Sequence, residues 1–108
     1  MAKFETTVIG DFDHILKKLE DGILKGSMSA SLEDASDFCD ADARCSVRVF
    51  ERYSISGENR VSLNVTLFQN KNGEVHLSAI TAGGSTGILF KVNTWGEETF
   101  LDKLKELL

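Results

Sequence analysis

The sequence predicts an α+β fold in two layers, with an antiparallel sheet of about five to six strands packed against N- and C-terminal helices. Three observations support this prediction. Apolar and polar residues alternate with a period of two in several runs between residues 43 and 79. Apolar residues recur at helical spacing in two segments, residues 12–24 and 97–108. Turn-forming sequences separate the alternating runs, which favours local hairpins in the order β-α-β-β-β-β-β-α.

Composition narrows the class of protein. The chain has 108 residues, 42% hydrophobic and 27% charged, and is expected to form one domain over residues 1–108. Its net charge of −5 argues against nucleic-acid and membrane partners, because binding phosphates needs clustered Lys and Arg. The start of the chain has no apolar run, which favours a cytoplasmic protein. Cys39 and Cys45 form no C-x-x-C pair, so reduced thiols are expected.

The first strand and the first helix follow from the N-terminal pattern. Residues 4–8 alternate between β-branched or aromatic residues and polar ones, which predicts a strand. Asp11 then provides a side-chain oxygen that can cap a helix over residues 12–24. Gly22 and Gly26 could each close this helix in the left-handed conformation, and the sequence leaves both open.

A short alternating run, residues 28–33, predicts the next strand, and the polar stretch from Asp34 to Asp42 is expected to be the longest loop. This stretch and the residue before it contain five carboxylates, Glu33, Asp34, Asp37, Asp40 and Asp42. Carboxylates are ligands for Ca²⁺ and Mg²⁺, but their spacing is not that of an EF-hand. A solvated loop without a metal is therefore the expectation.

Three further strands are predicted at residues 43–55, 61–67 and 75–79, with the odd-numbered side chains of each facing the core. Pairing must keep the buried positions of both strands on one face, which requires loops of odd length. Three-residue loops at 57–59 and 71–73 satisfy this condition, and each ends in a residue that tolerates the left-handed conformation.

The C-terminal part begins with a glycine-rich connection. Backbone amides and hydroxyls of Gly83, Gly84, Ser85 and Thr86 could bind an anion, although a strand at residues 88–92 follows and no helix dipole assists. The alternative is a plain connection between strands. Thr94 and Glu97 have capping-box spacing, so the chain is expected to end in an amphipathic helix.

The predicted registers collect a candidate site on the sheet face away from the helices. His76 would lie across from Phe68, Phe68 across from Arg48, and Ile80 beside Asn64. The full set on this outer face is Arg48, Phe50, Arg52, Asn64, Phe68, His76 and Ile80. Large apolar groups mixed with arginine favour an interface or a ligand site. A second copy, a small molecule or the glycine-rich loop could cover the face.

Four segments resemble a known family: residues 21–34 (DGILKGSMSASLED), 48–54 (RVFERYS), 59–66 (NRVSLNVT) and 96–104 (GEETFLDKL). They are similar to the bacterial family catalogued as domain of unknown function 6054. The resemblance spans nearly the whole chain and implies a small cytoplasmic protein of an anaerobic, clostridial-type bacterium. It implies no activity, substrate or catalytic residue.

The residues favour a non-enzymatic binding or interaction module, homodimeric through the outer sheet face, with no cofactor, no metal and no catalytic residue. Two alternatives stay open. One is a small-ligand carrier of helix-grip type, in which a curved sheet wraps the C-terminal helix. The other is a hydrolase or transferase that uses His76 as a base near Ser78, although no spacing in the sequence supports a convergent catalytic group.

Overall fold

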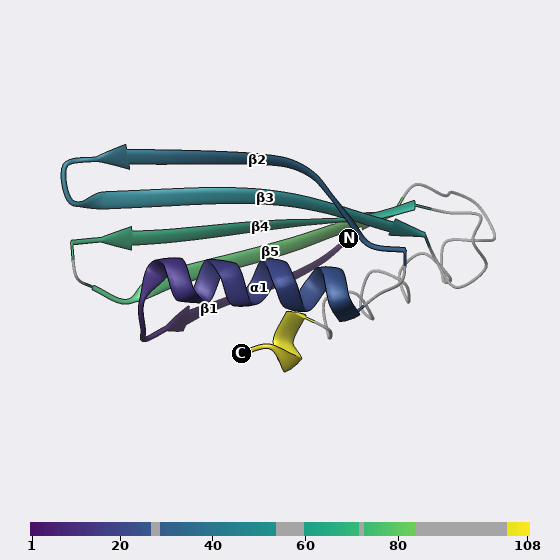
Figure 1. The fold of residues 1–108 in the computed structure, drawn as a ribbon, viewed down its shortest axis with the longest axis horizontal. Helices are drawn as coiled ribbons and strands as arrows, with labels where there is room; N and C mark the ends of the chain where they lie inside the picture. Colours follow the sequence, from purple (N-terminus) through teal and green to yellow (C-terminus); the bar gives the residue numbers. More distant parts are fainter. Residues whose placement is uncertain (27–28, 54–59, 72, 84–103) are drawn as a thin grey trace.

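The computed structural model describes residues 1–26, 29–53, 60–71, 73–83 and 104–108. Within them lies one five-stranded antiparallel sheet with the strand order β1-β5-β4-β3-β2 (Figure 1). The elements are β1 (Ala2–Val8), α1 (Phe12–Gly26), β2 (Ser31–Asp40), β3 (Ala43–Tyr53), β4 (Arg60–Asn70) and β5 (Val75–Gly83). A single helical turn at 104–106 lies near the C-terminus. The predicted α+β class and antiparallel sheet are confirmed.

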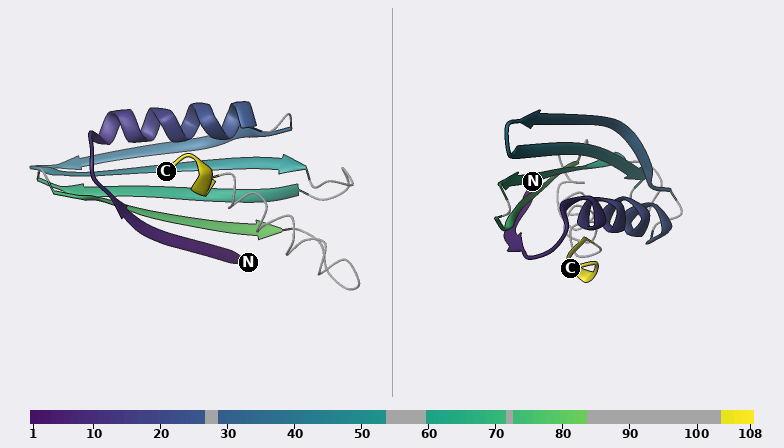
Figure 2. Two further views of the ribbon diagram at one scale, coloured as in Figure 1. Left: turned by 90° about the horizontal axis from the view of Figure 1, so that it is seen from below. Right: turned by 60° about the vertical axis from the view of Figure 1, so that its left-hand side comes forward.

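Helix α1 lies along one face of the sheet, which we call the inner face (Figure 2). Asp11 caps it as predicted, because its Oδ2 accepts a hydrogen bond of 3.0 Å from the backbone N–H of His14. Gly22 does not close the helix, which continues to Gly26. The core joins one stripe of α1 to the inner face of β3, β4 and β5 and to Leu104. Its α1 members are Phe12, Ile15, Leu16, Leu19 and Ile23.

The hairpin of β4 and β5 has the predicted register. Phe68 pairs with His76 and Asn64 with Ile80, so the odd-numbered residues of both strands face α1. Val61, Leu63, Val65 and Leu67 are buried there. This alternation was readable because one face of each strand is buried and the other is not.

The predicted register of β3 against β4 is wrong. Arg48 pairs with Val65, three positions from the predicted Phe68, and Tyr53 pairs with Arg60 across the undescribed residues 54–59. Because side-chain direction alternates, a shift of three positions turns β3 over. Arg48, Phe50 and Arg52 therefore face α1, while Cys45, Val47 and Val49 lie on the outer face.

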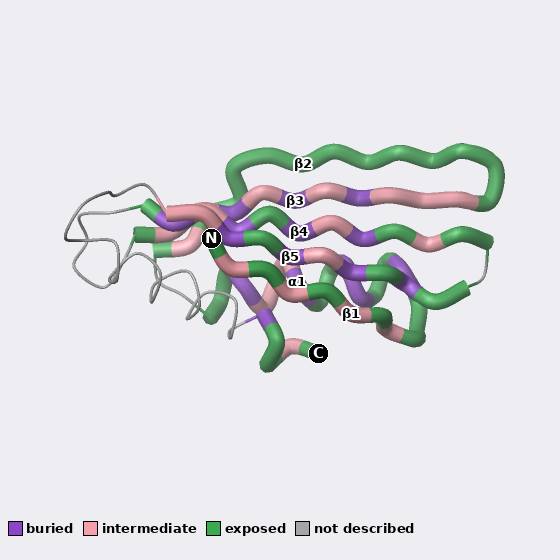
Figure 3. Tube along the Cα trace, turned by 180° about the vertical axis from the view of Figure 1, so that it is seen from behind, coloured by how far each residue is buried: buried purple, intermediate pink, exposed green. Residues whose placement is uncertain are grey.

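The predicted acidic loop is also wrong, because the structure has a strand there. β2 covers most of the stretch and pairs with β3 along its length, with a register shift between Leu32 and Asp34. A two-residue turn, in which Ala41 has a φ of 53°, joins β2 to β3. Every residue of β2 is exposed (Figure 3). Since neither face is buried, hydrogen bonds to β3 alone hold the strand, and no apolar alternation marks it.

The strand predicted at residues 88–92 and the capping box of Thr94 and Glu97 lie outside the described residues. So do Gly84, Ser85 and Thr86 of the candidate anion loop, while Gly83 is the last residue of β5. The predicted C-terminal helix is described only from Leu104, and residues 104–106 are helical.

Candidate functional site

The outer face is the surface of the sheet opposite α1. Its centre consists of nine side chains in three cross-strand rows over β3, β4 and β5. These are Cys45, Val47, Val49, Asn64, Thr66, Phe68, His76, Ser78 and Ile80. None of them is Asp, Glu, Lys or Arg, and we call this set the outer patch. The ion pair of Arg60 and Glu51, with an N–O distance of 2.5 Å, lies beyond one end of it.

The outer patch exposes large apolar side chains to solvent. Phe68 is 41% exposed and Ile80 is 40% exposed, and Val47 and Val49 beside them are half-buried. The Phe68 and His76 rings stack, with their centroids 6.2 Å apart and an interplanar angle of 26°. This pair, predicted from the β4–β5 register, forms an aromatic platform at one end of the patch.

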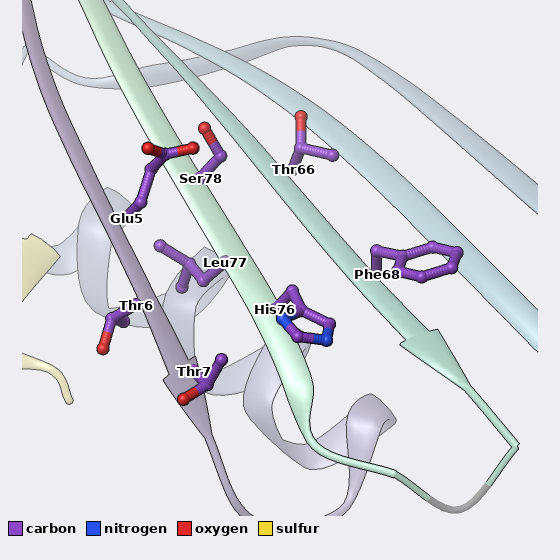
Figure 4. A pocket seen from close by; sticks show the side chains of 8 residues that line it. All are labelled: Glu5, Thr6, Thr7, Thr66, Phe68, His76, Leu77 and Ser78. Carbon is purple, nitrogen blue, oxygen red and sulfur yellow. The ribbon is translucent and has the colours of Figure 1, made fainter.

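An open depression of about 490 Å³ adjoins this platform on the β1 side (Figure 4). Phe68 and Thr66 line it from β4, His76 and Ser78 from β5, and Glu5 from β1. Hydroxyl, imidazole and carboxylate groups beside an aromatic ring could hold a small polar ligand. Among the described residues no hydrogen bond joins His76 to Ser78 or Glu5, so the depression offers no nucleophile–base contact of the kind that hydrolases use.

Arg48 belongs to a different site, on the inner face between α1, β2 and β3. Only 8% of Arg48 is exposed. Its Nε lies 3.4 Å from Glu20 Oε2, its Nη2 lies 3.1 Å from Asp37 Oδ1, and its Nη1 donates to the carbonyls of Ser36 and Val47. The arginine is therefore already occupied by structural partners.

Asp37 is the acceptor at the centre of this cluster. Ser46 Oγ donates a hydrogen bond of 2.6 Å to Asp37 Oδ1. This hydrogen bond, followed by the hydrogen bond and charge of Arg48, lowers the pKa of the Asp37 carboxyl. The sequence pattern did not predict this cluster, because its members come from three elements whose pairing cannot be read from spacing.

The other two predicted β3 residues also leave the outer patch. Phe50 is 1% exposed and belongs to the core. Arg52 is on the inner face, where burial lowers the pKa of its guanidinium. Of the seven predicted site residues, the structure therefore brings Asn64, Phe68, His76 and Ile80 together and separates the three from β3.

A second ion pair anchors the start of α1 to β3. Arg44 makes two hydrogen bonds to Asp13, of 3.1 Å and 2.7 Å, and its guanidinium lies 4.2 Å from the centroid of the Phe12 ring. The hydrogen bonds from Arg44 lower the pKa of Asp13. Cys39 and Cys45 are free. Cys39 pairs with Arg44 on the inner face of the sheet, and Cys45 pairs with Phe38 on the outer face.

Within the part of the chain that the structure describes, no three His, Cys, Asp or Glu side chains are grouped to hold a metal ion. No helix in the same residues is long and apolar enough to span a bilayer.

These features define an α+β protein with an open antiparallel sheet, one face of which packs on a helix while the other is not covered by any described residue. A family of unknown function, DUF6054, matches residues 1–108, and the chain belongs to this family. The resemblance found in the sequence is thereby confirmed. No curated protein and no solved structure matches the chain.

Proposed function

We propose that this protein is a non-enzymatic interaction module that forms a homodimer through the outer patch. The observation that carries the proposal is a sheet face that no described residue covers and whose patch of nine side chains contains no Asp, Glu, Lys or Arg. Phe68 and Ile80 are both exposed there, in adjacent strands. Exposed apolar groups that cluster on one face are typical of protein interfaces. Two-fold pairing of equal surfaces is the commonest way to cover such a face.

The charges at the two edges of the sheet favour one arrangement of the two copies. The registers place Lys3 on β1 and Asp34 on β2 at opposite ends of one row, which crosses Ile80, Asn64 and Val49. A two-fold axis parallel to the strands would turn this row end for end. Lys3 of each copy would then lie opposite Asp34 of the other, and the central strand β4 would face itself.

The same rotation brings matching groups together in the middle of the face. Phe68 would lie near Phe68 of the second copy, because β4 is the third of five strands and lies on the axis. Val49 would lie opposite Ile80. Sheets that pack face to face keep their strands within about 30° of each other, so the side chains named here would remain close to one another across the patch.

A small-ligand site is the second candidate function, and the depression beside Phe68 and His76 is the observation that favours it. In a helix-grip carrier the ligand would lie between the helix and the sheet. The described core offers no such space, since Leu63, Leu67 and Ile23 there are 0–1% exposed and pack together. A ligand would instead bind on the outer face.

Native mass spectrometry and light scattering on the purified protein test the dimer. The expected mass is twice 11.9 kDa. Phe68→Glu should give a monomer, because it places two carboxylates against each other on the axis. Leu24→Glu is the matched control, since Leu24 is 37% exposed on α1, away from the patch, and this variant should stay dimeric.

The edge charges test the orientation of the two copies. Lys3→Glu should weaken the dimer, and adding Asp34→Lys in the same chain should restore it. A wild-type mass of 11.9 kDa, or a folded Phe68→Glu variant that remains dimeric, would contradict the proposal. A monomer that carries a co-purified small molecule would favour the ligand site instead.

A further inference from the structure

β2 leaves one side of the sheet open. It is the last strand in the order β1-β5-β4-β3-β2, and β3 is its only neighbour among the described strands. The strand has ten residues, all of them exposed. No other described strand pairs with its outer edge, whose backbone N–H and C=O groups can therefore pair with another extended chain, apart from the Ala35 N–H, which donates to Asp34 Oδ1.

The side chains of β2 select against a second copy of the same strand. The strand carries four carboxylates and no Lys, Arg or Pro; these are Glu33, Asp34, Asp37 and Asp40. Like charges on paired strands are destabilising. Two β2 strands side by side would bring eight carboxylates together without a cation on either strand, so the edge repels its own copy and fits a basic segment.

Two of these carboxylates remain available for a basic segment. Asp37 is held by Ser46 and Arg48, and Glu33 accepts a hydrogen bond from Ser31. Asp34 Oδ1 accepts a hydrogen bond of 2.8 Å from the backbone N–H of Ala35, but neither Asp34 nor Asp40 has an ion pair among the described residues. Both point to the outer face, as do their partners Val49 and Ala43 on β3. An exposed aromatic side chain lies between them, because Phe38 is 62% exposed on the same face.

We propose that the free edge of β2 binds an extended basic segment of another protein as an added strand. The face beside Asp34, Ser36, Phe38 and Asp40 prescribes the pattern of that segment. It should carry Lys or Arg at two positions six residues apart, with apolar residues at the alternate positions between them. Backbone hydrogen bonds would provide the affinity, and the two charges and Phe38 would provide the selectivity. The added strand would use the edge of β2, whereas the dimer uses the face of β3, β4 and β5. The two proposals share Asp34, which the dimer would place opposite Lys3 of the second copy, so the oligomeric state is measured beside each binding experiment.

The test uses the full-length protein, labelled with ¹⁵N, and the capped peptide acetyl-Lys-Thr-Val-Thr-Val-Thr-Lys-amide. Titration should shift the amide resonances of residues 31–40, and every second amide of β2 should become slower to exchange with solvent. Replacing both lysines of the peptide by glutamate should weaken binding about tenfold, because two attractive cross-strand pairs become repulsive. Raising the salt concentration to 0.5 M should weaken binding of the lysine peptide, since the pairs are exposed.

A charge exchange separates this site from general attraction to an acidic protein. Asp34→Lys with Asp40→Lys should reverse the preference, so that the glutamate peptide binds more tightly than the lysine peptide. Both positions are exposed, and circular dichroism checks that the variant folds. A peptide N-methylated at alternate residues should not bind, because it cannot form the backbone ladder. Phe38→Ser should weaken binding with both charges left in place.

Three results would overturn the proposal. The N-methylated peptide could bind as tightly as the parent, which would show attraction by charge alone. The resonance shifts could fall outside β2. The outward amides of β2 could already be protected from exchange in the free protein, which would show that another part of this chain or a second copy covers the edge.

Discussion

Arg48 decides which way β3 faces. The sequence pattern predicts a polar face of β3 formed by Arg44, Ser46, Arg48 and Arg52, with valines on the other face. In the fold the arginine side is turned to the helix, because Glu20 on α1 and Asp37 on β2 neutralise Arg48 there. A charge on an inner sheet face is tolerated only when its hydrogen bonds and charge are matched.

Removing this guanidinium should destabilise the fold more than removing an exposed one. Arg48→Ala deletes two hydrogen bonds to carbonyls and the contacts with Glu20 and Asp37, so the free energy of unfolding should fall by about 2 kcal/mol. Arg60→Ala is the matched control, because Arg60 is 60% exposed in its pair with Glu51. This variant should lower the free energy of unfolding by less than about 1 kcal/mol. Urea denaturation of both variants measures the difference. Equal losses would contradict a structural role for Arg48.

The Asp37 carboxyl gives this cluster a pH dependence. Its pKa is lowered in the folded protein by Ser46 and then Arg48, so the ionised group stabilises the fold at pH values above its unfolded pKa of about 3.9. That contribution is lost as the pH falls through the lower, folded pKa. The stability difference between wild type and Asp37→Asn should therefore be present at pH 6 and shrink below about pH 4.

Because Asp37 is largely exposed, the difference should stay within about 1 kcal/mol. An NMR titration of the Asp37 carboxyl is the direct measurement. Ser46→Ala should raise its pKa toward the ordinary value, since the strongest cause of the shift is removed. An unchanged titration midpoint in Ser46→Ala would show that the hydroxyl has no such effect.

At the scale of the elements, Gly22 lets the C-terminal helical turn approach α1. The helix runs through this glycine, and a Cβ there would lie 2.6 Å from Leu107 Cδ1, which is an overlap. Leu107 packs against the core, and Leu104 beside it is fully buried. A residue that could have ended the helix thus provides space for a distant segment.

Gly22→Ala should therefore destabilise the protein although alanine favours helices. Overpacking against Leu107 should cost about 1–2 kcal/mol, more than the gain of up to about 1 kcal/mol in helix propensity. In a Leu107→Ala background the same change should become stabilising, because the overlap is gone. Gly26→Ala is the control, since no atom lies within 4 Å of a Cβ there. Thermal unfolding of the wild type, the two single variants at Gly22 and Leu107 and the double variant gives the coupling energy between the two positions. Additive effects of the two changes would contradict the contact.

β2 shows at this scale how a strand can form without an amphipathic pattern. Its ten residues are all exposed, and its hydrogen bonds to β3 define it. The carboxylates that make it resemble a loop in the sequence also protect its free edge from pairing with itself. The same feature makes a basic segment the fitting partner in the proposal above.

The whole molecule has three distinct surfaces that follow from one sheet. The inner face packs on α1 and forms the core. Among the described residues, none covers the outer patch, which has no Asp, Glu, Lys or Arg, and none pairs with the outer edge of the acidic strand β2. A dimer through the outer patch would use the face of the sheet, and an added strand would use the edge of β2. The two surfaces meet at Asp34, which would face Lys3 of the second copy in the dimer and a basic residue of the added strand at the edge.

The sequence by itself determined β1, α1, the β4–β5 hairpin and the family. In those elements one face is buried, or partly buried in β1, and the other is solvated, so the period of the apolar residues reports the fold, and Asn64, Phe68, His76 and Ile80 could be placed correctly. Only the tertiary structure decided the direction of β3 and the existence of β2. Either face of β3 could be buried, and Glu20 and Asp37, 28 and 11 residues away from Arg48, made the choice. β2 buries neither face, so its backbone pairing with β3 and the contacts of Asp37 with Ser46 and Arg48 specify it, and neither leaves a periodic signal in its side chains.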